Sequence, residues 1–168
     1  LAVSMVEKAK SGHPGGAMGG ADFINVLFSE FLVYDPNNPE WEGRDRFYLD
    51  PGHMSPMLYS ALAMQGKYTI DELKEFRQWG SVTPGHPERD IRHGIENTSG
   101  PLGQGHTYAV GAAIAEKFLE ARLSHTMMQH KIYAYISDGG IQEEISQGAG
   151  RVAGLLHLNN LIMFYDAN

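Results

Sequence analysis

Two short, almost uninterrupted apolar runs mark the second half of the chain. They cover residues 131–136 and 161–165, and the segment between them, residues 141–156, has the spacing of a helix. An apolar run without alternation is typical of a strand that is covered on both faces of a sheet. Strand, helix and strand in this order predict a right-handed, parallel βαβ unit.

The rest of the pattern is mainly helical. It predicts a short strand at 46–49 and helices at 2–10, 17–33, 55–65, 70–79 and 106–123. Asp22, Asn25 and Ser29 recur three and four positions apart, so they share one helix face, which we expect to be solvated. Thr69 and Glu72 have the spacing of a capping box. These elements predict an α/β fold of three layers, in which helices cover both faces of a mostly parallel sheet.

Residues 80–105 have no clear period and are rich in Gly, Pro, His, Thr and Ser. A loop of this length in a compact domain is usually a binding loop or a disordered segment. Most of the 20 glycines cluster at 12–20, 94–111 and 139–154. Clustered glycine is typical of tight turns, or of backbone that approaches a ligand closely.

The composition fits one soluble domain. The chain has 168 residues, 42% of them hydrophobic, which is enough for a single core. The formal net charge is −7 and no run of Lys or Arg occurs, which argues against a nucleic acid or an anionic membrane as a partner. The lack of cysteine excludes disulfides and thiolate metal sites. The sequence shown has no signal peptide or membrane span, so the cytoplasm is the default location.

Each apolar run ends in polar residues that suit a cation and an anion. Asp138 and Gly139 follow the first run, and Asp166 and Asn168 follow the second. The crossover brings both ends to one edge of the sheet, where ligands of open α/β sheets bind. Carboxylate and amide oxygens suit Mg²⁺ or Ca²⁺ and N–H groups at a helix start favour an anion, so a bound diphosphate is predicted. The alternative is that Asp138 and Asn168 only cap and turn their loops.

This spacing resembles the thiamine-diphosphate motif as transketolases carry it. Other segments resemble transketolase segments in the same order: residues 10–15 (KSGHPG), 51–53 (PGH), 83–88 (TPGHPE) and 100–105 (GPLGQG). Each piece alone is weak, but together they are specific, and the resemblance covers the whole chain. It implies a thiamine-diphosphate-binding fold, with thiamine diphosphate and Mg²⁺ (or Ca²⁺) as cofactors.

The resemblance assigns cofactor roles to several positions. Asp138 and the side chain of Asn168 would hold Mg²⁺, and Gly139 would touch the diphosphate. His53 would contact the cofactor. The aminopyrimidine ring would be lined by Gly100, Pro101 and Leu102.

His13 and His86, by the same resemblance, would face the sugar substrate and the reacting centre. Independently of it, histidine titrates near neutral pH, which suits proton transfers from and to sugar hydroxyls. A zinc site formed by His13, His53 and His86 is the alternative, although these residues lack the local spacing of paired zinc ligands. The other histidines stay open (His93, His106) or have no motif around them (His125, His130, His157).

Glu143 matches a glutamate that, in the family, joins a carboxylate network at a dimer interface. The alternative is a solvated helix residue. Three positions depart from the family pattern: Ser137 replaces the usual glycine before the aspartate, Gly140 replaces the usual residue after Asp-Gly, and Gly148 stands where a second interface glutamate is common. The last departure affects the expected carboxylate network and not the cofactor site.

The resemblance implies two-carbon ketol transfer between ketose and aldose phosphates in the pentose phosphate pathway, by a cytoplasmic homodimer. A C-terminal pyrimidine-binding domain or subunit would supply the glutamate that activates the cofactor. Leu1 opens the chain within a helical pattern, so we expect residues 1–168 to be a diphosphate-side domain, truncated at both ends and inactive alone. The alternatives are an enzyme similar to deoxyxylulose phosphate synthase, or a cofactor-binding partner subunit without activity of its own.

Overall fold

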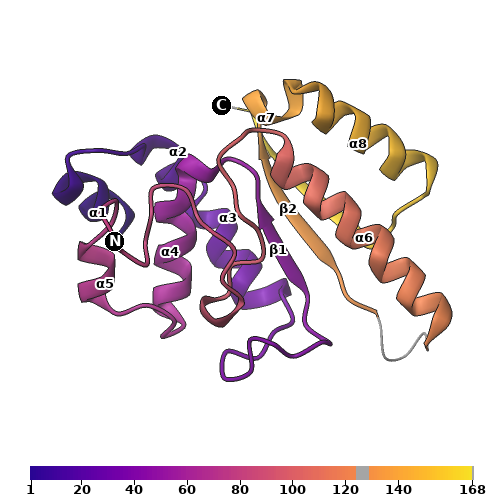
Figure 1. Ribbon diagram of the computed structural model, residues 1–168, viewed down its shortest axis with the longest axis horizontal. Helices are drawn as coiled ribbons and strands as arrows, with labels where there is room; N and C mark the ends of the chain where they lie inside the picture. Colours follow the sequence, from indigo (N-terminus) through magenta and orange to yellow (C-terminus); the bar gives the residue numbers. More distant parts are fainter. Residues whose placement is uncertain (124–128, 168) are drawn as a thin grey trace.

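The computed structural model describes residues 1–123 and 129–167 and contains a parallel sheet of three strands (Figure 1). The strands are β1 (Arg46–Leu49), β2 (Ile132–Ser137) and β3 (Leu161–Asp166), in the spatial order β1-β2-β3. In the register, Leu49 lies opposite Tyr135 and Tyr135 lies opposite Phe164. The carboxyl ends of all three strands therefore lie at one edge of the sheet.

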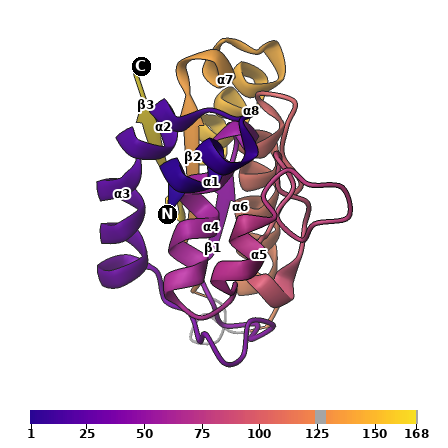
Figure 2. The ribbon, with the colours of Figure 1, turned by 90° about the vertical axis from the view of Figure 1, so that its left-hand side faces the viewer.

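Helices lie on both sides of the sheet, which confirms the predicted three-layer α/β fold. One side carries α1 (Ala2–Ala9), α2 (Pro14–Gly19), α3 (Ala21–Val26), α4 (Ser55–Met64) and α5 (Ile70–Lys74). The other side carries α6 (Gln104–Arg122) and α8 (Glu144–Leu155), with the short α7 (Asp138–Gln142) at the upper end in Figure 1. Figure 2 looks onto the side that carries α1, α4 and α5.

The sheet separates two hydrophobic clusters. Phe47 and Tyr133 belong to the larger cluster, which packs against α1 to α5. Tyr48 and Ala134, their neighbours along the strands, belong to the smaller cluster, which packs against α6. Successive strand residues point to opposite faces, and both faces of β2 are buried. The continuous apolar run at 131–136 is explained by this double cover.

The helix predicted at 17–33 is wrong as a single helix. The chain forms α2 and α3 with a break at Gly20, and then one π-helical turn at Leu27–Phe31. A Cβ atom added at Gly20 would lie 2.4 Å from the Met57 sulfur, so the backbone must pass close to α4 here. The predicted solvated face is confirmed, since Asp22, Asn25 and Ser29 are all exposed.

The helix predicted at 141–156 is also divided. It starts earlier, at Asp138, and Glu143 has extended backbone (φ −65°, ψ 134°) that separates α7 from α8. The Ser137 hydroxyl accepts the Gly140 N–H at 3.1 Å. The departure at Ser137 thus provides an N-cap for α7.

The remaining boundaries differ less. The helix predicted at 70–79 ends at Lys74, but its capping box is confirmed: the Glu72 N–H donates to Thr69 Oγ1 and the Thr69 N–H donates to Glu72 Oε2. A 3₁₀ turn at Gly52–Met54 lies just before α4, and a second one, at Ile91–His93, lies within the long loop of residues 80–105. None of the described helices is long and apolar enough to span a membrane.

The expectation that β3 is covered on both faces is wrong for this chain. Ile162, Met163, Phe164 and Tyr165 are each 39–51% exposed. The physical reason is that β3 is an edge strand, paired within the described chain only with β2. Phe23 of α3 stacks on Phe164 at 4.1 Å between ring centroids, which is partial cover.

Candidate active site

A cleft of ≈ 380 Å³ lies at the carboxyl edge of the sheet. Asp138 and Gly139 border it at the end of β2, and Asp166 borders it at the end of β3. The opposite walls come from distant segments: residues 12–16, His53, Met54 and Leu102. Five of the residues that were predicted as site residues therefore meet in one place: His13, His53, Leu102, Asp138 and Gly139.

Asp50 joins two of these segments, and sequence reasoning missed it. Its side chain is fully buried at the end of β1. The carboxylate accepts the N–H of Gly103 at 3.1 Å and the N–H of His106 at 3.2 Å. It therefore caps the first turn of α6, whose own N-cap residue, Gly103, has no side chain to do so. A carboxylate directly before the PGH segment was the signal that could have revealed it.

Close backbone contacts also hold the segment after Asp50 against residues 100–106, and we call this region the Asp50 joint. A Cβ atom at Gly52 would lie 2.8 Å from the Gly100 nitrogen, and one at Gly105 would lie 2.5 Å from the Asp50 Cα. Neither position has room for a side chain, so these glycines are required by close approach. The joint presents Leu102 to the cleft, where a Cβ atom at Gly139 would be 3.2 Å from Leu102 Cδ1.

Gly100 and Pro101 are placed differently from Leu102. Neither borders the cleft. Gly100 has φ 148° and lies against the imidazole of His86, since a Cβ atom there would be 3.3 Å from His86 Nδ1. Pro101 is exposed. The role predicted for both, contact with the aminopyrimidine, stays a prediction.

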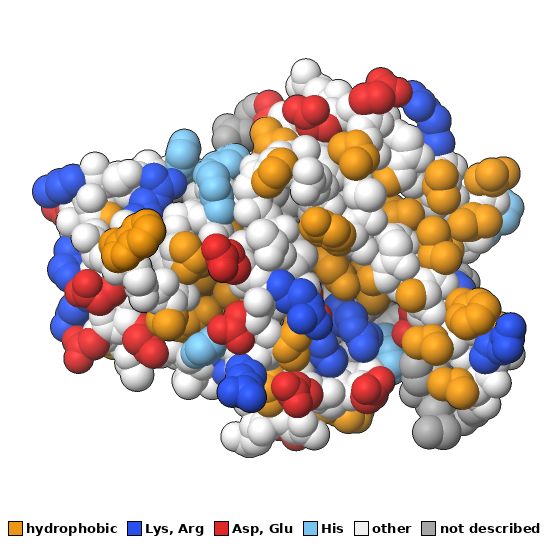
Figure 3. Space-filling view, in the orientation of Figure 1, with side chains coloured by type: hydrophobic (Ala, Val, Ile, Leu, Met, Phe, Trp, Pro, Cys, Tyr) orange, Lys and Arg blue, Asp and Glu red, His pale blue; other side chains and the backbone are white. Residues whose placement is uncertain are grey.

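Two histidines, His13 and His53, border the cleft, and a third, His86, lies near them without bordering it. The rings of His13 and His53 have centroids 4.9 Å apart, and His86 is close enough to perturb His53. Figure 3 shows histidine side chains grouped beside lysine and arginine side chains at the upper edge of the molecule.

The surroundings of His53 and His86 favour neutral imidazoles. Burial lowers the pKa of His53, and the charges of His13, His86 and Arg77 lower it further, while Asp50 opposes them. Burial likewise lowers the pKa of His86, with smaller contributions from Arg77 and His13. A neutral imidazole can accept a proton from a hydroxyl group.

The metal predictions have different outcomes. Among residues 1–123 and 129–167, no three His, Asp or Glu side chains are arranged to hold a metal ion, so the three-histidine zinc alternative has no support. Within the described chain, the Asp138 carboxylate has no hydrogen-bond or ion-pair partner at the cleft wall, as suits a ligand for a hard cation. Its predicted co-ligand, Asn168, lies outside the described residues.

Glu143 lies away from the cleft, at the exposed N-cap of α8. It packs on the start of α6, since a Cβ atom at Gly103 would lie 2.8 Å from Glu143 Cβ. Gly148 is on the same helix, with open space where a side chain would be. The predicted interface role of Glu143 stays a prediction.

The other described histidines are not part of the cleft. His157 is exposed, and His125 lies outside the described residues. The remaining three each contact a neighbouring side chain: His93 with Asp90 at 2.5 Å, His106 with Ser146 at 2.6 Å and His130 with Glu116 at 2.9 Å.

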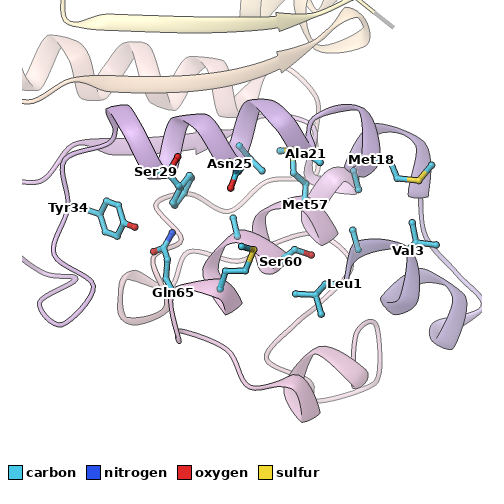
Figure 4. Close-up of a pocket in the computed structure, with 16 residues that line it drawn as sticks. Leu1, Val3, Met18, Ala21, Asn25, Ser29, Tyr34, Met57, Ser60 and Gln65 are labelled. Carbon is cyan, nitrogen blue, oxygen red and sulfur yellow. The ribbon is translucent and has the colours of Figure 1, made fainter.

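A second hollow, of ≈ 470 Å³, lies among α1, α3 and α4 (Figure 4). Tyr34 and Gln65 lie toward one end, and Val3 and Met18 toward the other. Its lining is mainly apolar and contains no histidine, acid or base. Five of the predicted site residues border the first cleft and none borders this hollow, so we take the first cleft as the active site.

Comparisons with known proteins agree with this site. The family described as "Transketolase, thiamine diphosphate binding domain" matches residues 1–168. "Transketolase 1" of Pasteurella multocida is 49% identical over the whole chain, which spans 26% of that relative's length. A transketolase structure from Leishmania mexicana has 46% identity and a TM-score of 0.96, covering 100% of this chain and 26% of that one.

A more distant transketolase structure, from Pichia stipitis in complex with sedoheptulose 7-phosphate, has 38% identity and a TM-score of 0.85. The match covers 99% of this chain and 25% of the Pichia stipitis chain. The family match over every residue and the near-superposable structure lead to one conclusion. The chain belongs to the transketolase family, and all of its residues match the thiamine diphosphate binding domain of that family.

Proposed function

We propose that the protein containing this chain is a transketolase that transfers a two-carbon ketol unit from a ketose phosphate to an aldose phosphate. The observation that carries the proposal is the meeting of Asp138, Gly139, His13 and His53 at one cleft, with His86 nearby. The Pichia stipitis relative is in complex with a ketose phosphate, which supports the substrate class. The other relatives reported above are transketolases too, so nothing among them favours a deoxyxylulose phosphate synthase.

This chain would supply the diphosphate and metal half of the cofactor site. Asp138 and Asn168 would hold Mg²⁺ or Ca²⁺, because carboxylate and amide oxygens suit hard cations. Gly139 would offer its N–H to the diphosphate. The 100–102 segment would line the aminopyrimidine, and its Leu102, next to the Gly103 that Asp50 holds, borders the cleft. Thiamine diphosphate, when bound, supplies the carbanion chemistry, and the protein supplies orientation and proton transfer.

The histidines would move protons. His53 would contact the cofactor, while His13 and His86 would exchange protons with sugar hydroxyls. Their convergence from three loops and the lowered pKa values of His53 and His86 support this role. A group that is neutral at neutral pH can act first as a base and then return the proton.

The whole enzyme would be a cytoplasmic homodimer of the pentose phosphate pathway. A C-terminal pyrimidine-binding domain would add the glutamate that activates the cofactor. The chain spans 26% of the relatives' length, which leaves ample room for further domains in such a protein. Glu143 would lie at the dimer interface, and its exposure in this chain is compatible with that place.

The test uses the full polypeptide that carries this chain. Turnover is measured with a ketose phosphate donor and an aldose phosphate acceptor, in the presence of Mg²⁺ and thiamine diphosphate. The transketolase proposal predicts turnover with this pair and none with pyruvate as donor. The reverse result would indicate the synthase, and a protein inactive on both pairs would indicate a partner subunit.

Asp138→Ala tests the metal assignment in the same protein. Saturable binding of thiamine diphosphate at ordinary Mg²⁺ concentrations should be lost, as measured by titration calorimetry. Glu144→Ala removes an exposed carboxylate nearby on α8 and serves as the matched control, which should bind normally. Unchanged affinity in Asp138→Ala would refute the assignment.

A further inference from the structure

Arg77 lies near His53 and His86 and has an unusual backbone conformation. Its φ is 61°, in the left-handed region that few residues with a Cβ atom adopt. A hydrogen bond to a later segment stabilises this conformation, because the Arg77 N–H donates to the Thr83 carbonyl at 3.0 Å. A rare backbone conformation that its surroundings maintain suggests a requirement for the direction of the side chain.

The guanidinium joins two loops of the cleft. Arg77 Nη1 donates to Ser11 Oγ at 2.8 Å, two residues before His13. On its other side it lies against Gly85, one residue before His86, where a Cβ atom would be only 2.7 Å from Arg77 Nε. Sixty-six positions separate Arg77 from Ser11, so this contact is set by the fold and not by local sequence.

We propose that Arg77 is a positioning residue that fixes the Ser11 loop against the Gly85 loop and thereby sets the positions of His13 and His86 relative to each other. Its guanidinium is also a fixed positive charge beside His53 and His86. The role is not that of a catalytic residue, since Arg77 does not border the cleft. The rate effects described below rest on the proposed transketolase function. The structural part of the proposal stands without it.

The electrostatic part follows from the groups around each ring. His86 is influenced by Arg77 and His13, both of which lower its pKa. His53 is influenced by His13, His86 and Arg77, which lower its pKa, and by Asp50, which raises it. Arg77 is the only one of these groups that stays positive at all relevant pH values. Removing its charge should therefore raise the pKa of both rings.

The sign of the pH effect follows directly. With a higher pKa, His86 and His53 are protonated at higher pH than in the wild type. A protonated imidazole cannot accept a proton, so the acidic limb of the kcat/KM profile should move to higher pH. Loss of the contact to Ser11 acts separately, because a misplaced histidine lowers the rate at every pH.

The experiment compares variants of the full-length protein. Arg77→Met removes charge and hydrogen bond, Arg77→Lys keeps the charge without the planar guanidinium, and Ser11→Ala removes only the hydrogen-bond acceptor. Arg89→Met is the matched control, an exposed arginine of the same loop region that does not influence either ring. The readouts are kcat/KM against pH and the titration of the histidine rings by NMR.

We expect kcat/KM to fall roughly 10-fold or more in Arg77→Met, with the acidic limb moved to higher pH. Arg77→Lys and Ser11→Ala should lower the rate and leave the limb in place, and Arg89→Met should change neither. An Arg77→Met enzyme with wild-type rate and wild-type limb would overturn the proposal. If Arg77→Met does not fold, Arg77→Gln replaces it with the same expected result.

The NMR titration separates this proposal from the proposed function. In a protein without transketolase turnover, raised histidine pKa values in Arg77→Met would still support the role of Arg77. Unchanged histidine titration would overturn its electrostatic part, whatever the activity of the wild type.

Discussion

Single buried groups control the geometry of this site more than the residues that border it. Asp50 touches no part of the cleft, yet its carboxylate holds Gly103 and His106 of the α6 start. The N–H donors of both residues would lose their partner if that carboxylate were removed. A buried donor without a partner is costly because it has also lost its contact with water.

Asp50→Ala should therefore lower the free energy of unfolding by about 2 kcal/mol or more, because the buried N–H groups of Gly103 and His106 would be left without an acceptor. The measurement is the change in Tm of the full-length protein without cofactor. Asp71→Ala, which removes an exposed carboxylate paired with Lys74, should leave Tm nearly unchanged. Equal Tm values for the two variants would contradict the capping role of Asp50.

His86→Ala tests the proton-transfer role at the same scale. If His86 exchanges protons with the sugar, kcat should fall by roughly 10²–10⁴-fold while cofactor affinity changes little. His157→Ala, an exposed histidine far from any motif, is the control. A His86→Ala enzyme with normal turnover would assign His86 a structural role only.

The sequence predicted some of these residues and not others for physical reasons. His13, His53, Asp138 and Gly139 lie in motifs, and the end of a parallel strand has a known place in the fold. Asp50 and Arg77 act through contacts with residues more than fifty positions away. Long-range contacts of this kind leave no local sequence pattern, so only the three-dimensional structure reveals them.

Elements show the same division between local pattern and tertiary contact. The strands and the long helices α4 and α6 were predicted nearly at their observed positions, because apolar periodicity records which face is buried. The breaks at Gly20 and Glu143 were missed. Helical spacing continues through both, and each break lies at a tertiary contact: Gly20 faces Met57 of α4, and Glu143 packs on Gly103 at the start of α6.

Gly20→Ala should destabilise the protein by about 1–3 kcal/mol, because the added methyl group would overlap the Met57 sulfur at 2.4 Å. The same change at Gly111, on the exposed side of α6 with open space around it, should stabilise by up to about 1 kcal/mol. The two Tm shifts should have opposite signs. A stable Gly20→Ala protein would mean that α2 and α3 can separate from α4 at little cost.

At the scale of the whole molecule, β3 leaves a run of apolar side chains at the surface. Ile162 to Tyr165 are exposed along an edge strand, and edge strands with apolar side chains tend to associate. The side chains of Leu155 (78% exposed) and Leu156 (50% exposed), on and just after α8, are exposed as well. In the relatives, which are about four times longer, further chain is available to cover these side chains.

We therefore expect the isolated 168-residue polypeptide to associate in solution, to bind thiamine diphosphate weakly, and to show no measurable transketolase turnover. Light scattering and a coupled assay with sugar phosphates, Mg²⁺ and cofactor are the measurements. Supplying the rest of the protein, in one reading frame or as a second chain, should restore both binding and turnover. Turnover by the isolated polypeptide would show that the activating group lies within these residues.

The joint between Asp50 and the start of α6 also has a consequence for binding entropy. Its hydrogen bonds and backbone contacts involve only groups of the protein, so they exist before any ligand arrives. The segment that carries Leu102 is thus preorganised, and little ordering remains to be done when the cofactor enters. Contacts between the cofactor and this segment then contribute to affinity, because little conformational entropy is lost in ordering the segment on binding. In hydrogen exchange, the amides of Gly103 and His106 should be protected to the same degree with and without thiamine diphosphate.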